Sequence, residues 1–325
     1  MFLGNTPADF GHLPPQFTGD VQTFFPNSIT ANTYWQHWTK PRGVSMVYMC
    51  AVGGGGGGGG GRDGASNTAR GGGGGGGSGA YATLMVPAIF LPDVLKIQVG
   101  HGGQGGAAST NGTAGIASGV SFGSGLTAGG SSPNLILRGN GGSAGGAGSL
   151  TAGGTFGAAG TVTGFGAIQQ FGVSLNNSGQ AGVGGGAHTG NAGSPITSVF
   201  ASSPLSGGSG GAGINTPAQV GFAGGALGLQ SALDFGDGTL TPAAAFRAGG
   251  VAGTLGVAGG PGNAGLYSIK PFHNTGGTGG GSCDNAAGGA GGPGGIGCGG
   301  GGGGAGTTGG RGGDGGPGIV IIISW

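Results

Sequence analysis

Short apolar runs stand apart along this chain, separated by long stretches of small residues. The runs are rich in β-branched and aromatic residues and are bounded by Gly, Pro, Asn or Ser, a pattern typical of β-strands. They cover residues 45–52, 81–86, 95–99 and 319–325, with a weaker run at 134–138. The first and last runs are too apolar to stand alone, so we expect them to share one sheet. The chain between residues 100 and 318 is then an excursion from a small β base.

A second pattern, with a period of three, fills that excursion. Gly occupies every third position from Gly250 to Gly265, and glycine pairs separate Ala290, Pro293 and Ile296. This period fits neither an α-helix nor a strand, but it fits the polyproline II helix, which has three residues per turn and no internal hydrogen bonds. Where glycines line an edge, no Cβ separates two backbones, and their N–H and C=O groups can bond directly. The sequence therefore predicts a polyglycine II bundle. A collagen triple helix is disfavoured because the glycine phase is lost between tracts.

The spacing also ranks the tracts by depth in the bundle. Residues 53–61 and 71–77 are all glycine, so they are bare on every edge and are expected at the centre. Gly-Gly-X tracts are bare on two edges and belong to the next layer. The tract at 250–265 is bare on one edge and belongs outermost.

Composition supports an ordered chain and excludes several functions. The 325 residues include 99 Gly, while eight Asp, no Glu and nine Lys or Arg give a formal net charge of +1. Disordered chains combine low hydrophobicity with high charge, whereas the mean hydropathy here is +0.14. Scattered basic residues disfavour nucleic acid, and no apolar run reaches the length of about 18 residues that a membrane span needs. We also expect no signal peptide. The predicted fold class is mainly β with little helix: a small β base plus the bundle.

Residues that could carry chemistry are isolated. The five His residues lack metal-ligand spacing, and Asp234-Phe235-Gly236 resembles a kinase triplet without the other kinase elements. Cys283 and Cys298 could pair, although a reduced state is favoured. We therefore expect no enzyme, no cofactor and no metal.

Residues 1–37 differ from the rest because they contain little Gly and much Pro and aromatic residue. Such a density of proline forbids a regular helix. We expect an attachment arm (1–37) preceding a glycine-rich domain (38–325). The arm is expected to bury Phe10, Phe17, Phe24 and Phe25 against a neighbouring subunit or another protein; packing on its own domain is the alternative.

Bulky residues in the spacers between glycine tracts are candidate contacts for a receptor. Aromatic side chains on turns can stack on sugars or hold a partner, but they can equally cap the bundle. The candidates are Phe171, Phe200, Phe235, Phe246, Tyr267, Phe272 and His273.

Three motifs resemble the glycine-rich domain of bacteriophage tail-fibre and other virion proteins. The first is Trp38-Thr39-Lys40-Pro41-Arg42-Gly43-Val44, which leads into the strand before Gly53. The second is Ser121-Phe122-Gly123 followed by Leu126-Thr127-Ala128-Gly129-Gly130. The third is Asp314-Gly315-Gly316-Pro317-Gly318, which runs into the last strand. The resemblance covers residues 38–325. More loosely, the chain is similar to phage distal adhesins, whose polyglycine II sandwich displays variable receptor-binding loops.

The resemblance implies a structural virion protein, assembled in the host cytoplasm, that is a tail-fibre, tail-tip or adhesin component contacting the host surface. Other virion proteins would be bound through the N-terminal arm, the receptor would be a surface glycan or an outer-membrane protein, and fibres of this kind are commonly homotrimers. A capsid decoration or head-fibre protein is the alternative. A non-viral glycine-rich wall or ice-binding protein is a more remote alternative.

Overall fold

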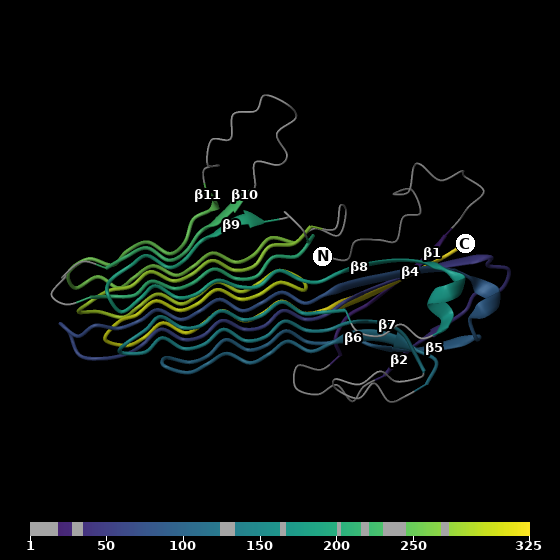
Figure 1. Ribbon diagram of the computed structural model, residues 1–325, viewed down its shortest axis with the longest axis horizontal. Helices are drawn as coiled ribbons and strands as arrows, with labels where there is room; N and C mark the ends of the chain where they lie inside the picture. The colour runs from purple at the N-terminus through teal and green to yellow at the C-terminus, as the bar shows by residue number, and fades with distance from the viewer. Residues whose placement is uncertain are drawn as a thin grey trace, which may run out of the picture.

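The fold has two parts that lie end to end, a β-sandwich and a long bundle of extended segments (Figure 1). The computed structural model describes residues 19–27, 35–123, 134–162, 167–199, 203–215, 221–229, 245–267 and 273–325. The architecture is mainly β with almost no helix, as the sequence predicts.

The first sheet of the sandwich has five antiparallel strands. Its order is β1 (Asp20–Phe24), β12 (Ile319–Ser324), β3 (Met46–Val52), β4 (Tyr81–Pro87) and β8 (Val173–Asn177). Ile321 lies opposite Cys50 in the β12–β3 pair. The expectation that the runs at 45–52 and 319–325 share a sheet is therefore confirmed.

The second sheet has four antiparallel strands and packs against the first. Its order is β2 (Gln36–Thr39), β5 (Val94–Gln98), β6 (Ser118–Ser121) and β7 (Leu135–Gly139). Two short 3-10 helices, η2 (Ala88–Phe90) and η3 (Ala167–Phe171), flank the sheets. Because side chains alternate along a strand, one face of each sheet supplies the core, which includes Trp38, Met49, Leu84, Ile97, Ile136 and Ile322.

The prediction of a single excursion from the β base between residues 100 and 318 is wrong. The chain returns to the sandwich as β6, β7 and β8, all within that range, and residues 53–80 already belong to the bundle. The bundle is thus built from repeated passages, because each extended segment must be bonded to neighbours that come from elsewhere in the chain.

Consecutive residues of a bundle segment bond to three different neighbours, which is the signature of a threefold helix. The N–H groups of Gly57, Gly58 and Gly59 donate to the carbonyls of Thr113, Gly313 and Gly74 at 2.8–2.9 Å. Three residues on, the pattern repeats with the same segments. The carbonyls of the same tract accept from residues of three further segments: Gly103 and Gly106, Gly142 and Gly145, and Gly300 and Gly303. Segment 53–61 therefore has six neighbours, as a polyglycine II lattice requires.

Five segments are buried with neighbours on every side. They are residues 53–61, 71–79, 206–214, 274–283 and 298–306. The central placement predicted for 53–61 and 71–77 is confirmed. Segment 298–306 was missed although its six glycines from Gly299 to Gly304 give the same signal.

The predicted layering is wrong for two Gly-Gly-X tracts, 206–214 and 274–283, which lie in the interior, and right for the outermost tract. Segment 206–214 lies in the interior because its X residues, Ser206, Ser209 and Ala212, are small, and the Ser209 hydroxyl donates to the Gly225 carbonyl at 2.6 Å. The 250–265 tract is outermost, with most of its X residues exposed. It is not one helix, however. A turn at residues 254–257 with Gly256 at φ 75° divides it into two antiparallel segments.

A small third sheet lies on the bundle (Figure 1). It contains β11 (Ala245–Arg247), β10 (Leu227–Leu229) and β9 (Ile196–Val199), with β10 and β9 parallel. Ile196 and Leu227 are buried beneath it.

The described part of the predicted arm belongs to the sandwich. β1 pairs with β12 along its whole length, and Phe24 packs against the sandwich core. Phe24 is partly buried against the core of its own chain, which is the alternative that the sequence left open. Phe25 is 49% exposed, while Phe10 and Phe17 lie outside the described residues.

Candidate functional site

An exposed aromatic surface lies at the end of the bundle nearest the sandwich. The side chain of Tyr267 is 68% exposed, that of Leu266 is 40% exposed, and His273 is also exposed. Their backbone is fixed by the bundle. Leu266 and Thr275 bond to each other through N–H donors from both residues, at 2.8 and 2.9 Å.

Contacts on both sides extend this rigid frame. The N–H of Asn274 donates to the Pro204 carbonyl at 2.9 Å, and its side-chain amide donates to the Ile296 carbonyl at 3.0 Å. From the third sheet, Arg247 donates through Nη1 to the Ala264 carbonyl at 2.6 Å. We call Tyr267, His273 and strand β11, with its Phe246, the bundle-end surface.

The structure brings together only some of the predicted contact residues. Phe246 lies in β11, although its side chain is not described, and Tyr267 and His273 share the adjoining bundle end. Phe171 lies elsewhere, on η3 of the sandwich, where it stacks on Phe90 with ring centroids 4.6 Å apart. Phe200, Phe235 and Phe272 fall outside the described residues.

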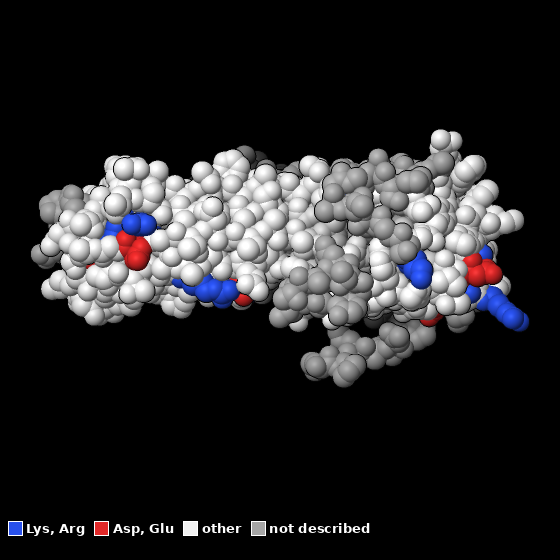
Figure 2. All heavy atoms as spheres, turned by 90° about the horizontal axis from the view of Figure 1, so that it is seen from below, with Lys and Arg blue, Asp and Glu red and all other residues white. Residues whose placement is uncertain are grey.

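The surface of the molecule is nearly uncharged, as Figure 2 shows for one face. Arg247 is the charged residue of strand β11, and the aromatic side chains of the bundle-end surface offer stacking, apolar contact and hydrogen bonds. Within the described ranges, no three His, Cys, Asp or Glu side chains gather into a possible metal site. No helix there is long and apolar enough to cross a bilayer.

The cysteines are free and buried. Burial raises the pKa of Cys50 and of Cys298 to about 12, so both stay as unreactive thiols near neutral pH. Cys283 and Cys298 do not form the disulfide that the sequence left open.

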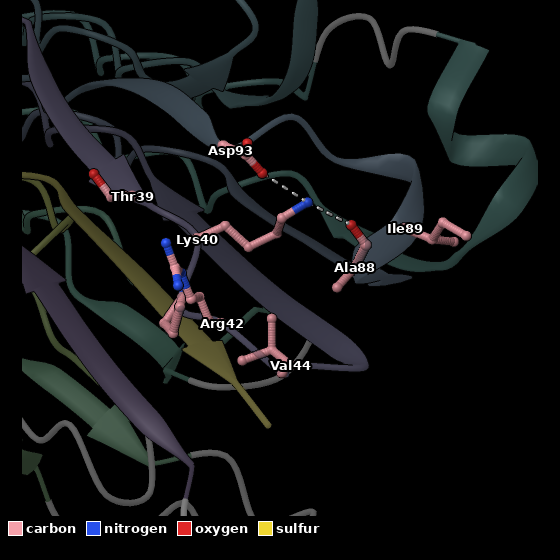
Figure 3. Close-up of a pocket in the computed structure, with 9 residues that line it drawn as sticks. Thr39, Lys40, Arg42, Val44, Ala88, Ile89 and Asp93 are labelled. Atoms are coloured by element: carbon pink, nitrogen blue, oxygen red, sulfur yellow. Dashed lines mark hydrogen bonds and ion pairs between the residues drawn. The ribbon is translucent and has the colours of Figure 1, made fainter.

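A pocket at the far end of the sandwich is formed around the motif that begins at Trp38 (Figure 3). Lys40 crosses it and donates to the carbonyls of Leu91 at 2.7 Å and Ala88 at 3.3 Å, with Asp93 at 3.4 Å. Two hydrogen bonds and one ion pair hold its ammonium group, so Lys40 tethers the loop after η2.

The other residues of that motif are also structural. Trp38 is fully buried in the sandwich core, and Val44 packs against the same core. Gly43 has φ 81°, a left-handed conformation that other residues adopt only at a cost. The motif therefore contributes to the packing of the sandwich core.

The distal end of the bundle contains a buried ion pair that the sequence did not reveal. Arg70 is 0% exposed and donates through Nη2 to the carboxylate of Asp284 at 2.7 Å. The same carboxylate accepts from the N–H of Asn67 at 3.0 Å. Desolvation lowers the pKa of Arg70, and the Asp284 charge opposes that shift. The pair joins two tip loops, 62–70 and 284–287. The only sequence signal is a charged residue placed directly before the Gly71 tract.

The fold and surface define the class: a polyglycine II bundle carried by a β-sandwich, with exposed aromatic side chains at the bundle end nearest the sandwich. No protein-family model and no curated protein matches the chain.

Proposed function

We propose that this chain is a structural protein of a bacteriophage particle, a tail-fibre, tail-tip or adhesin component that contacts the host surface. The observation that carries the proposal is the bundle-end surface. Tyr267 and His273 are exposed on a backbone held from both sides by bundle hydrogen bonds. Rigid aromatic side chains bind with little loss of conformational entropy, and an exposed aromatic platform of this kind suits stacking on a surface glycan.

The rigidity of the bundle supports the same proposal. Its segments are crosslinked by backbone hydrogen bonds in several directions, so the chain forms a rigid rod. Such a rod keeps a contact surface away from the body of a particle. The resemblance at Trp38–Val44 and Asp314–Gly318 points to virion proteins and to assembly in the host cytoplasm.

Attachment to other virion proteins through the N-terminal arm is part of the proposal. β1 and β2 pair within the sandwich, so attachment would use other residues of the predicted arm, 1–37. That the protein forms a homotrimer stays a prediction. Measuring the molecular mass of the purified protein in solution would test it.

The test combines particle labelling with cell binding. We expect antibody fragments against the chain to label the tail of the particle and to block adsorption. The purified chain should bind host cells, and a Tyr267→Ser/His273→Ser variant should bind about tenfold or more weakly, because each removed anchor costs about 1–2 kcal/mol.

The matched control is Phe156→Ser, which removes an aromatic ring that is 58% exposed on the side of the bundle. This control should bind normally. Labelling on the head would support the capsid decoration or head-fibre alternative instead. Unchanged binding by the double variant would show that contact lies elsewhere.

A further inference from the structure

An exposed apolar patch lies at one edge of the five-stranded sheet, along β8 and the two 3-10 helices beside it. We call it the β8-edge patch. Phe90 of η2 stacks on Phe171 of η3, and Val173 lies opposite Met85 near the end of β4, so β8 begins beside η2. Ile89 points away from Lys40 and its pocket (Figure 3). The members of the patch are large apolar residues, each at least 45% exposed: Ile89, Phe90, Phe171, Val173 and Leu175.

Among the sheet edges that the structure describes, the edge at β8 is the one without a protecting residue. An edge strand offers backbone groups to another chain, and proteins commonly guard such edges with charge or proline. The five other edge strands have such a residue within them or directly beside them: Asp20 in β1, Lys40 after β2, Arg138 in β7, Pro195 before β9 and Arg247 in β11. The stretch from Phe171 to Asn177, which contains β8, has neither a charge nor a proline. This edge is therefore open to association.

The β8-edge patch is large enough to form most of a stable interface. Because a large apolar side chain has roughly 150–200 Å² of surface, the five members at their exposed fractions offer about 500 Å². Patches of this size mark interaction sites on soluble proteins, and a stable complex buries about 800 Å² on each partner. The exposed amides Gln170 and Asn176 lie among the members and add a polar rim.

The lack of charge favours a second copy of this chain as the partner. Around a symmetry axis a side chain can meet its own equivalent, so a charged residue there would face a like charge. The segments that form the patch, 84–92 and 167–177, contain no charged residue. An amide both donates and accepts hydrogen bonds, so Gln170 and Asn176 can pair with copies of themselves. A foreign partner chosen by electrostatic complementarity would need charge that these segments lack.

We propose that copies of this chain associate through the β8-edge patch. Val173 and Leu175 of one copy pack against a neighbouring copy, and the open edge of β8 is covered. This interface shares no residue with the bundle-end surface and does not depend on a role in a virion. It can serve the predicted homotrimer or a dimer, and the mass in solution gives the number of copies.

Analytical ultracentrifugation across the micromolar range tests the proposal with a Val173→Lys/Leu175→Lys variant. We expect the unaltered chain to associate and the variant to need a concentration about 100-fold higher or more, because like charges would meet at the interface. The matched control is Val251→Lys/Leu255→Lys, at positions 70% and 67% exposed on the outermost bundle tract. This control should associate like the unaltered chain, and circular dichroism checks that both variants fold.

Amide hydrogen exchange of the unaltered chain decides the matter if the β8 variant does not fold. Residues 171–177 should exchange several-fold faster after dilution to the monomer, while the central strand β3 keeps its rate.

Three results would overturn the proposal: an unaltered chain that stays monomeric, a folded β8 variant that associates like the unaltered chain, or exchange at 171–177 that does not change on dilution. Protection of these residues only within an assembled particle would assign the patch to another protein. A monomer that still binds host cells would remove this interface and leave the proposed function standing.

Discussion

At the scale of single residues, glycine makes the bundle possible because it has no Cβ atom. A Cβ added at Gly58 would lie 2.1 Å from the carbonyl oxygen of Gly301, and comparable approaches recur throughout the interior. Ordering glycine costs more backbone entropy than ordering any other residue, and hydrogen bonds to several neighbouring segments offset that cost. Many of the interior positions that carry a side chain are Ser, Thr or Ala, and a hydroxyl there can replace a backbone partner. Ser209, for example, also accepts from the N–H of Gly279 at 2.9 Å.

The Arg70–Asp284 pair is the residue-scale exception, a large ion pair buried at the bundle tip. We expect Asp284→Asn to destabilise the protein by about 3–5 kcal/mol, because it leaves the Arg70 charge buried without a counter-charge. Denaturant unfolding followed by circular dichroism measures the change.

The matched control is Asp314→Asn, which breaks the exposed Arg311–Asp314 pair at 2.5 Å. Exposed pairs contribute about 0–1 kcal/mol, so this variant should unfold near the parent. Similar losses in both variants would mean that the buried pair does not hold the tip loops.

At the scale of elements, a threefold helix presents each edge at every third residue. In the outer segment after the turn, a Cβ on Gly259, Gly262 or Gly265 would come within 2.0–2.1 Å of a carbonyl oxygen of segment 274–283. The residues between them are mostly exposed. Tolerance to substitution should therefore follow a period of three.

We expect Gly262→Ala to cost about 1–3 kcal/mol, because the Cβ forces two hydrogen-bonded backbones apart. Ala264→Leu, two residues away and exposed, should stay within about 0.5 kcal/mol of the parent. Thermal unfolding of both variants gives the comparison. Equal sensitivity at both positions would indicate that the segment is not a threefold helix.

The elements also show how far the sequence could predict the fold. Strands β3, β4, β5, β7 and β12 follow from β-branched and aromatic runs, and the bundle follows from the period of three. β6 was missed because Ser118–Ser121 contains only one large apolar residue, Val120, and its strand is specified by pairing with β5 and β7. β1 was missed because five residues in a proline-rich stretch carry little pattern. The neighbours of each bundle segment could not be predicted, since glycine tracts of equal length are interchangeable by sequence.

The candidate site was predictable by residue type but not by position. Of the spacer aromatics, Tyr267 and Phe171 are exposed, and their role as receptor contacts stays a prediction. Their separation into a bundle end and a sandwich end depends on which way each segment runs. The direction in which each segment runs is set by its hydrogen bonds to neighbouring segments.

At the scale of the whole molecule, the sandwich and the bundle use opposite means of stabilisation. The sandwich buries large apolar side chains such as Trp38, Met49 and Leu84, whereas the bundle satisfies backbone groups with few side chains. The strands of the sandwich lead directly into bundle segments, as β3 does at Val52–Gly53 and β12 at Gly318–Ile319. The sandwich thereby fixes where several segments begin, which a glycine tract alone cannot do.

The most direct test of the bundle is the detection of individual hydrogen bonds by NMR scalar couplings across N–H···O=C in isotope-labelled protein. The structure predicts couplings from the N–H groups of Gly57, Gly58 and Gly59 to the carbonyls of Thr113, Gly313 and Gly74, on three different segments. Couplings of these three residues to one segment, or none at all, would contradict the polyglycine II bundle.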